Sequence, residues 1–545
     1  MLDTLQPVST VAQPAPPGPP REPLGESAWG PLHESAFRAI WIASVVSNVG
    51  TWMQNVGVAW LMTTLTPSPV LVALIQTATT LPVFLIGLPA GALADLIDRR
   101  RLLLISQTWM LIAAAALGIL TLANLTTPLA LLALTFALGL GGAVNSPAWQ
   151  AIVPELVPRR KLATAVALNG AGFNLARAVG PALGGLLVAA AGPGAVFILN
   201  AASFLATIVV LFRWRRAPRP PSDQPAERLI GATLAGLRYV RFSPALRALL
   251  ARSAIFVVCA SALWALLPVV ARQRLGLDSS GYGALLACLG LGAVAGAFGL
   301  PRMRVLVKLD MLVAAATIVF GLTTIALGWL TVLPVLLVAL ALAGLAWLMI
   351  MSSFNVAAQT VAPAWVSARV LSAYLLVSQG GLALGSLAWG AVADQFGLPT
   401  ALGLAGVGLC LGIVAAPLWR LERKRIDLRP SVPLAEVPGT DQIDPERGPV
   451  LITVEYRVAR DNTREFIAAM QDVRIVRRRD GAVRWRLYQD PLDAERFVET
   501  FVVSSWAEHM RQHERGTMAD HEIKERARHL SRGTPLVSHL IAAEP

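Results

Sequence analysis

Apolar segments of about twenty residues recur from residue 37 to residue 420 of this chain. The hydrocarbon core of a bilayer is ~30 Å thick, and a helix of ~20 apolar residues spans it. Because a helix satisfies its own backbone hydrogen bonds, each segment is predicted to be a membrane-spanning helix or a helix buried in protein. The chain is therefore predicted to lie in a membrane and to move something across it.

Hydropathy at the window length of a membrane span predicts twelve transmembrane helices in two six-helix halves. The predicted spans are 37–63, 70–94, 102–123, 129–152, 163–190, 194–213, 248–271, 281–300, 310–330, 332–357, 369–392 and 399–420. The stretch that opens with Gly180 resembles the stretch that opens with Gly381, which indicates an internal duplication. Such repeats are typical of secondary transporters, which bind substrate between the halves.

The charged residues support this topology. Only 14% of residues are charged, against roughly a quarter in soluble proteins. The formal net charge of +13 comes mostly from loops and from the C-terminal region, which favours topology over nucleic-acid binding. Basic loops such as Arg99–Arg101 and Arg159–Lys161 alternate with loops that carry little beyond Arg272 and Arg274. By the positive-inside rule we expect both termini to lie in the cytoplasm.

Composition divides the rest of the chain. Residues 1–36 are predicted to be a disordered Pro-rich tail, 37–213 the N-terminal half, 214–247 a cytoplasmic basic linker, 248–420 the C-terminal half and 421–448 a second linker. Residues 449–545 are predicted to form a cytoplasmic α+β domain. Its predicted order is strand 450–458, helix 462–478, strands 482–488 and 496–503, helix 505–530 and strand 536–541, which is the ferredoxin-like plan.

The loop after the second predicted span resembles the signature loop of the major facilitator superfamily. The matching residues are Gly91, Leu93, Asp95, Arg99 and Arg100. Asp98 stands where that family usually has Gly, and Leu96 where it often has Arg. The resemblance implies a gating motif in which Asp95 binds cationic groups or a helix N-terminus of the other half. The alternative is a plain basic cytoplasmic loop.

The fifth predicted span ends in a motif that resembles the helix-packing element of exporters in this superfamily. Its residues are Gly180, Pro181, Gly184 and Gly185. Glycine allows close helix approach and proline bends the span. The resemblance implies export, although Asn174 and Ala178 replace two earlier glycines of the element. Ordinary packing by small residues is the alternative.

Arg177 is the charge deepest within a predicted span. A buried charge is costly, so it usually faces a cavity, or else holds two helices together. The residues predicted to form the substrate cavity are Asn48, Gln54, Asn145, Asn174, Arg177, Asn355 and Gln379, with Asn55, Gln150 and Gln359 as further polar candidates. No acidic residue falls in the middle of a predicted span, which favours an anionic or neutral cargo over a cation. Proton coupling would then use Asp95, Asp310 or the cargo itself.

Three longer stretches of the sequence resemble one branch of this superfamily. Residues around 47–61, 143–187 and 197–204 resemble the siderophore (enterobactin) exporter branch, whose relatives include macrolide and multidrug efflux proteins. The C-terminal domain resembles the antibiotic-biosynthesis-monooxygenase-like α/β-barrel domains. There, His509 and His513 have helical spacing, with His521 two turns on, and either hold a metal or belong to a solvated face.

We therefore predict a secondary active transporter that exports a siderophore or drug-like compound by alternating access coupled to protons, and that is not an enzyme. We expect it to be a multi-pass protein of the bacterial inner membrane. We expect no cofactor, no metal and no nucleic-acid partner, and a homodimer that pairs through the C-terminal domain. One alternative is a bifunctional protein whose C-terminal domain is a monooxygenase-like enzyme acting on the cargo. Another is a sensor whose transport is vestigial.

Overall fold

The computed structural model describes residues 29–214, 236, 238–363, 365–414, 427–429, 431 and 443–543. Most of the predicted N-terminal tail and of the two predicted linkers lies outside these residues. The described chain begins with a short 3-10 turn at Gly30–His33, and α1 begins at Ser35, two residues before the predicted span.

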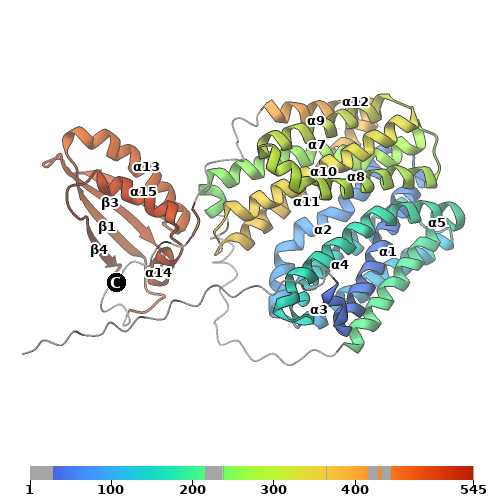
Figure 1. Ribbon diagram of the computed structural model, residues 1–545, viewed down its shortest axis with the longest axis horizontal. Coiled ribbons are helices and arrows are strands. Elements are labelled where there is room, and N and C mark those ends of the chain that lie inside the picture. The colour runs from blue at the N-terminus through green and yellow to red at the C-terminus, as the bar shows by residue number, and fades with distance from the viewer. Residues whose placement is uncertain are drawn as a thin grey trace, which may run out of the picture.

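The first bundle contains five helical elements, coloured blue to green in Figure 1: α1 (Ser35–Leu65), α2 (Pro69–Leu96), α3 (Arg99–Leu122), α4 (Pro128–Leu156) and α5 (Leu162–Arg213). Gly192 interrupts α5 with a positive φ of 78°, a conformation that favours glycine. The two arms of α5 on either side of Gly192 match the predicted spans 163–190 and 194–213. Asp98 caps α3 by accepting a hydrogen bond from the Arg101 amide, so the residue that departs from the family loop has a local structural role.

The second bundle contains α7 (Pro244–Val269), which continues as a π-helix to Arg274, and then α8 (Ser279–Leu306), α9 (Leu309–Trp329), α10 (Leu333–Val361), α11 (Ser367–Phe396) and α12 (Leu398–Val414). Asp278 caps α8 by accepting from the Gly281 amide. Figure 1 shows the two bundles side by side.

Within the described residues, nine helical segments are long and apolar enough to cross a membrane. One of them is the 55-residue segment Arg159–Arg213, which contains the break at Gly192. α1 is not among the nine, and its sequence includes the polar residues Asn48, Gln54 and Asn55. α12 has 17 residues in the described part, fewer than the usual length of a span.

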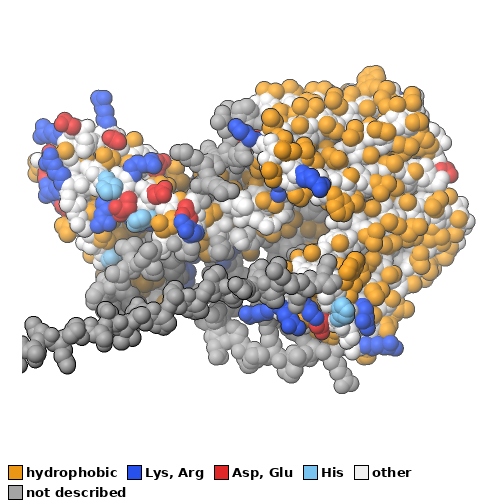
Figure 2. Space-filling model, viewed as in Figure 1, with side chains coloured by type: hydrophobic (Ala, Val, Ile, Leu, Met, Phe, Trp, Pro, Cys, Tyr) orange, Lys and Arg blue, Asp and Glu red, His pale blue; other side chains and the backbone are white. Residues whose placement is uncertain are grey.

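Charge is distributed unevenly over the two bundles. Figure 2 shows hydrophobic side chains over most of their visible surface, whereas Lys and Arg gather at one end and over the C-terminal domain. We call this the basic end, where Arg99, Arg100, Lys161, Arg213 and Arg304 lie. The other end, where α1 ends and α2 begins, is the opposite end.

The two bundles are held together toward the opposite end. Ser68 Oγ donates to Asp394 Oδ1 at 2.8 Å, and Gln273 Nε2 donates to the Pro67 carbonyl at 2.9 Å. Two further hydrogen bonds join the bundles toward this end, from Thr77 to the Ala383 carbonyl and from Arg272 to Thr63. The structure is therefore closed at the opposite end.

The C-terminal domain is a four-stranded antiparallel sheet with helices on one face (Figure 1). Its elements are β1 (Val450–Arg457), α13 (Thr463–Asp480), β2 (Arg484–Gln489), β3 (Arg496–Val503), α14 (Trp506–Glu514), α15 (Met518–His529) and β4 (Leu536–Ile541). The strand order is β2-β3-β1-β4, and alternate residues of β1 and β3 are buried. The four strands and the helix after β1 follow the predicted plan. The predicted helix 505–530 is wrong: Thr517 forms a capping box with Asp520, so a new helix begins there.

Candidate functional site

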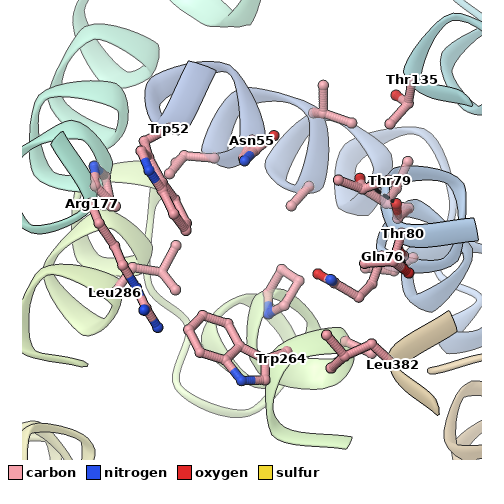
Figure 3. Close-up of a pocket in the computed structure, with 18 of the residues that line it drawn as sticks. Trp52, Asn55, Gln76, Thr79, Thr80, Thr135, Arg177, Trp264, Leu286 and Leu382 are labelled. Atoms are coloured by element: carbon pink, nitrogen blue, oxygen red, sulfur yellow. Dashed lines mark hydrogen bonds between the residues drawn. The ribbon is translucent and has the colours of Figure 1, made fainter. Parts of the chain in front are cut away.

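A cavity of about 460 Å³ lies between the two bundles (Figure 3). Residues of both bundles line it, and most of them are apolar or aromatic: Trp52, Asn55, Val56, Val58, Ala59, Val72, Ile75, Gln76, Thr79, Thr80, Thr135, Phe173, Arg177, Pro181, Trp264, Ala265, Pro268, Tyr282, Leu286, Trp347, Gln379 and Leu382. Its size and apolar walls with a few polar groups are typical of small-molecule sites. No acidic side chain is among these lining residues.

Arg177 on α5 lies beside two indole rings in this cavity. Its guanidinium carbon is 5.8 Å from the ring centroid of Trp52 on α1 and 5.6 Å from that of Trp264 on α7. In the described part of the chain Arg177 has no carboxylate partner, and neither its Nε nor the indole Nε1 of Trp264 has a hydrogen-bond partner. A half-buried cation without a carboxylate partner is suited to binding an anion, and the flat rings extend that site with stacking surface.

Polar groups of α2 form the wall across from Arg177. Gln76, Thr79 and Thr80 lie on the right of Figure 3, and Gln76 points into the cavity. The hydroxyls of Thr79 and Thr80 donate to carbonyls one turn earlier in their own helix. Sequence analysis missed these three residues. Their spacing of three and four places them on one helix face, which was a signal available in the sequence.

Of the residues predicted for the cavity, Arg177, Gln379 and the further candidate Asn55 line it. Gln54 is 4% exposed, and its Oε1 accepts from Asn200 Nδ2 at 2.5 Å in the second arm of α5. Asn145 Oδ1 accepts from Ser106 and Gln107 of α3, both at 3.2 Å. Gln54 and Asn145 thus bond helices together within the first bundle.

Three other predicted residues make contacts within their own helices. Asn48 Nδ2 donates to Ser44 Oγ at 3.3 Å, and Asn174 Nδ2 donates to the carbonyl four residues earlier at 2.9 Å. Asn355 Oδ1 accepts from Gln359 Nε2 at 2.6 Å. These three, like Gln150 and Gln359, are not among the residues that line the cavity. Their part in cargo binding stays a prediction.

Two arginines of the predicted gating motif connect helices of the first bundle at the basic end. Arg99 Nη1 donates to Glu155 Oε1 at 2.8 Å and to the Ala151 carbonyl of α4 at 2.9 Å. Arg100 donates to the last carbonyls of α5, those of Leu211 and Phe212. Gly91 and Leu93 lie on the last turns of α2. The side chain of Asp95 lies outside the described part, so its gating role stays a prediction.

The glycines of the predicted helix-packing motif allow α5 to pack closely against α1 in its own bundle and against α8 in the other. A Cβ on Gly184 would lie 2.8 Å from the Met53 Cα of α1, and a Cβ on Gly180 would lie 2.5 Å from the Trp52 Cβ. A Cβ on Gly185 would lie 2.6 Å from the Ser279 carbonyl oxygen of α8, in the other bundle. Pro181 of the same motif lines the cavity. Side chains at these positions would force the helices apart.

The C-terminal domain docks on the basic end of the second bundle. Arg238, on the helical stretch before α7, pairs with Glu508 of α14 at 2.7 Å and donates to the Gly481 carbonyl at 3.4 Å. The Arg515 guanidinium carbon lies 4.8 Å from the centroid of a Trp365 ring in the loop between α10 and α11. A charged pair and a cation–aromatic contact therefore hold the C-terminal domain on the second bundle.

The histidines of this domain are arranged differently from both predictions. His509 is 4% exposed, so the predicted solvated face is wrong for this residue. His513 Nε2 lies 3.3 Å from His509 Nε2, and the third ring of the cluster belongs to His539 of β4, not to His521. Burial lowers the pKa of His509 to about 3 and that of His513 to about 4. Among the described residues, no group of three potential ligands is arranged to hold a metal ion.

Comparison with known proteins supports the architecture. A family model described as "Transmembrane secretion effector", of the major facilitator superfamily, matches residues 26–545, which include the C-terminal domain. The multidrug efflux pump Tap of Mycolicibacterium fortuitum is 28% identical over 72% of this chain and 97% of its own length. The staphyloferrin A transporter of Staphylococcus aureus is 23% identical over 67% of this chain and 92% of its own. The enterobactin exporter EntS of Salmonella choleraesuis is 29% identical over 55% and 71%.

Solved structures show the same fold. A bacterial homologue of the human lysosomal transporter Spinster, inward-facing and unoccupied, aligns with a TM-score of 0.55 at 16% identity over 72% of this chain and 95% of its own. A POT family transporter in complex with 5-aminolevulinic acid aligns with a TM-score of 0.59 at 12% identity over 72% and 98%. The predicted resemblance to major facilitator superfamily exporters is thus confirmed, and the family and these relatives are transporters rather than enzymes. The resemblance of the C-terminal domain to monooxygenase-like domains stays a prediction. The chain belongs to the transmembrane secretion effector family of major facilitator superfamily transporters.

Proposed function

We propose that this protein exports an anionic or neutral small molecule, a siderophore or a drug-like compound, by alternating access coupled to protons. The basic end faces the cytoplasm in this proposal, in agreement with the positive-inside rule. Twelve spans in two six-helix halves follow when the second arm of α5, α1 and α12 are added to the nine segments that meet the length and apolarity criteria. Both termini are then cytoplasmic. Tap, the staphyloferrin A transporter and EntS support the cargo class, since by name they move drugs or siderophores.

The observation that carries the proposal is the environment of Arg177. An unpaired guanidinium between two indoles in a cavity at the interface of the two bundles favours a planar anion over a cation. The hydrogen-bond donors and acceptors of Asn55, Gln76 and Gln379 complete a site for a polar ligand. Closure at the opposite end supports a state in which the cavity is shut off from the outside. Asp95, Asp310 or the cargo itself would carry the coupled proton.

We include pairing of two copies through the C-terminal domain in the proposal. The sheet face away from the helices exposes Tyr488, Leu536 and Leu540 by 52%, 71% and 56%, and the strand register places them on one side. Chemical crosslinking of full-length protein in the membrane tests this point. A protein that remains monomeric at native density contradicts pairing.

Flux measurements on Arg177 variants test the function. We expect Arg177→Ala to abolish export of an anionic cargo and Arg177→Lys to restore it only in part, because lysine lacks the planar fork of donors. Arg247→Ala is the matched control, since Arg247 is exposed on the first turns of α7 and does not line the cavity. Cargo is first found by comparing metabolites in the medium of deletion and parent strains. Normal flux and affinity in Arg177→Ala would contradict the proposal.

A further inference from the structure

The two rings of a stacked aromatic pair line two different cavities. Tyr282 of α8 lines the central cavity. A second cavity of about 440 Å³ lies at the opposite end, and Trp60 of α1 lines it. The Trp60 and Tyr282 rings are stacked, with centroids 6.1 Å apart and planes at 22°. Apart from Ser279, the residues that line the second cavity belong to the first bundle, so the pair places one ring at each cavity.

Trp60 is also held by a cation from the other bundle. The guanidinium carbon of Arg272 lies 5.7 Å from the Trp60 ring centroid, and its Nη1 donates to Thr63 Oγ1 at 3.4 Å. Trp60 and Thr63 belong to α1, whereas Arg272 and Tyr282 belong to the second bundle. All of these contacts must break if the bundles separate at this end.

The two cavities differ in charge. The central cavity contains Arg177, whereas no charged side chain lines the second one. Its polar groups are hydroxyls and an amide, from Thr64, Thr121, Asn124, Thr126 and Ser279. An anion would bind more weakly there than beside Arg177. Weaker binding of an anion in the second cavity than beside Arg177 would favour release of the cargo.

We propose that Trp60, Tyr282 and Arg272 form the outer gate, and that the second cavity is the exit site that receives cargo from the central cavity. The inference rests on the proposed alternating-access export. The gate is closed in the present structure, where these contacts between the bundles are formed. Opening moves Trp60 away from both groups of the second bundle and joins the central cavity to the outside.

Thiol accessibility tests the gate without any cargo. In a background free of the three native cysteines, Thr79→Cys places one thiol in the wall of the central cavity. A membrane-impermeant maleimide is added from outside to intact cells. We expect Trp60→Ala and Tyr282→Ala each to raise the labelling rate about ten-fold, because an aromatic stack or cation–aromatic contact of this kind shifts an equilibrium by that order. Trp60→Phe retains a ring and stays close to the parent rate.

Trp329→Ala is the matched control, because Trp329 ends α9 at the opposite end and is 66% exposed. Labelling from the cytoplasmic side, in inverted vesicles, shows that each variant is folded. The gate is refuted if Trp60→Ala and Tyr282→Ala label at the parent rate from outside, or if Trp329→Ala labels as fast as they do. A failure of the export proposal leaves these rates unaffected, since they are measured without substrate. A parent protein that labels rapidly from outside would instead refute the assigned orientation.

Discussion

The docking of the C-terminal domain on the second bundle leads to an asymmetric mutational prediction. Glu508 is 6% exposed and contacts three guanidinium groups, those of Arg515 and Arg511 in its own domain and that of Arg238. Burial alone would raise the pKa of Glu508, but hydrogen bonds and charge from Arg515, with Arg238 and Arg511, lower it below its ordinary value. The carboxylate is therefore ionised at neutral pH, and its charge is compensated even without Arg238.

The loss of stability expected from each substitution depends on which charged groups are left without a partner. Arg238→Ala removes one charge-assisted hydrogen bond of a side chain that is 28% exposed, so we expect undocking to become easier by about 1–2 kcal/mol. Glu508→Ala leaves Arg515, which is 7% exposed, without its carboxylate. Breaking a buried pair in this way costs about 3–5 kcal/mol. Glu508→Ala is thus expected to cost more than Arg238→Ala.

Hydrogen exchange of the full chain in nanodiscs measures both effects. The segments 238–242 and 505–515 contain the contact, and their amides report local opening free energies. Arg511→Ala is the control, since Arg511 bonds the same carboxylate without contacting the second bundle, and it should leave exchange in 238–242 unchanged. Equal losses of protection in Arg238→Ala and Glu508→Ala, or none in either, would refute the argument.

Three further predictions concern separate parts of the chain. Asp95→Asn should strongly reduce the transport rate in vesicles without reducing membrane insertion, because the carboxylate charge that would hold the two halves together is lost. A variant that transports at the parent rate would refute the gating role. Deletion of residues 430–545 should leave a protein that still transports, since the residues lining the cavity end at Leu382, and total loss of flux per inserted protein would make the domain part of the mechanism. Because the folded state depresses the pKa of His509 to about 3 and of His513 to about 4, the C-terminal domain should be fully stable above pH ~6.5 and lose stability as pH falls toward 4. Hydrogen exchange of β4 corrected for intrinsic rates follows this loss, and a pH-independent profile contradicts it.

The helices could be predicted from the sequence because hydropathy and helix length are local properties. The chain also marks the junction of the two α5 arms, since Gly192 and Pro193 stand together in an otherwise apolar run. The strands of the C-terminal domain were equally readable from alternation of apolar residues in β1 and β3. The break between α14 and α15 was missed because a charged helical pattern continues through Gly516, and the Thr517 capping box was not recognised.

The cavity could be predicted only in part. Arg177 could be predicted because placing a single charge within an apolar span costs free energy, so such a residue usually has a functional role. The Asn and Gln side chains gave a weaker signal, because the sequence of one helix does not indicate which other helix each of its faces contacts. Gln54 pairs with Asn200, which is 146 residues away, and no local pattern contains that distance. The aromatic walls at Trp52 and Trp264 were missed for the opposite reason, since tryptophans in apolar runs look like lipid-facing or packing residues.

The distribution of contacts also bears on how the C-terminal domain would behave during transport. Its described contacts outside itself and its own linker reach Arg238, Tyr239, Phe242 and Trp365, all of which lie on the side of the second bundle. Tyr239 is itself fixed to that bundle, since its hydroxyl donates to the Val361 carbonyl at 3.2 Å. A rigid-body motion of one bundle against the other would leave these contacts unbroken. The domain should therefore travel with the second bundle, and its loss should affect the bundle that carries it more than the cavity between the two.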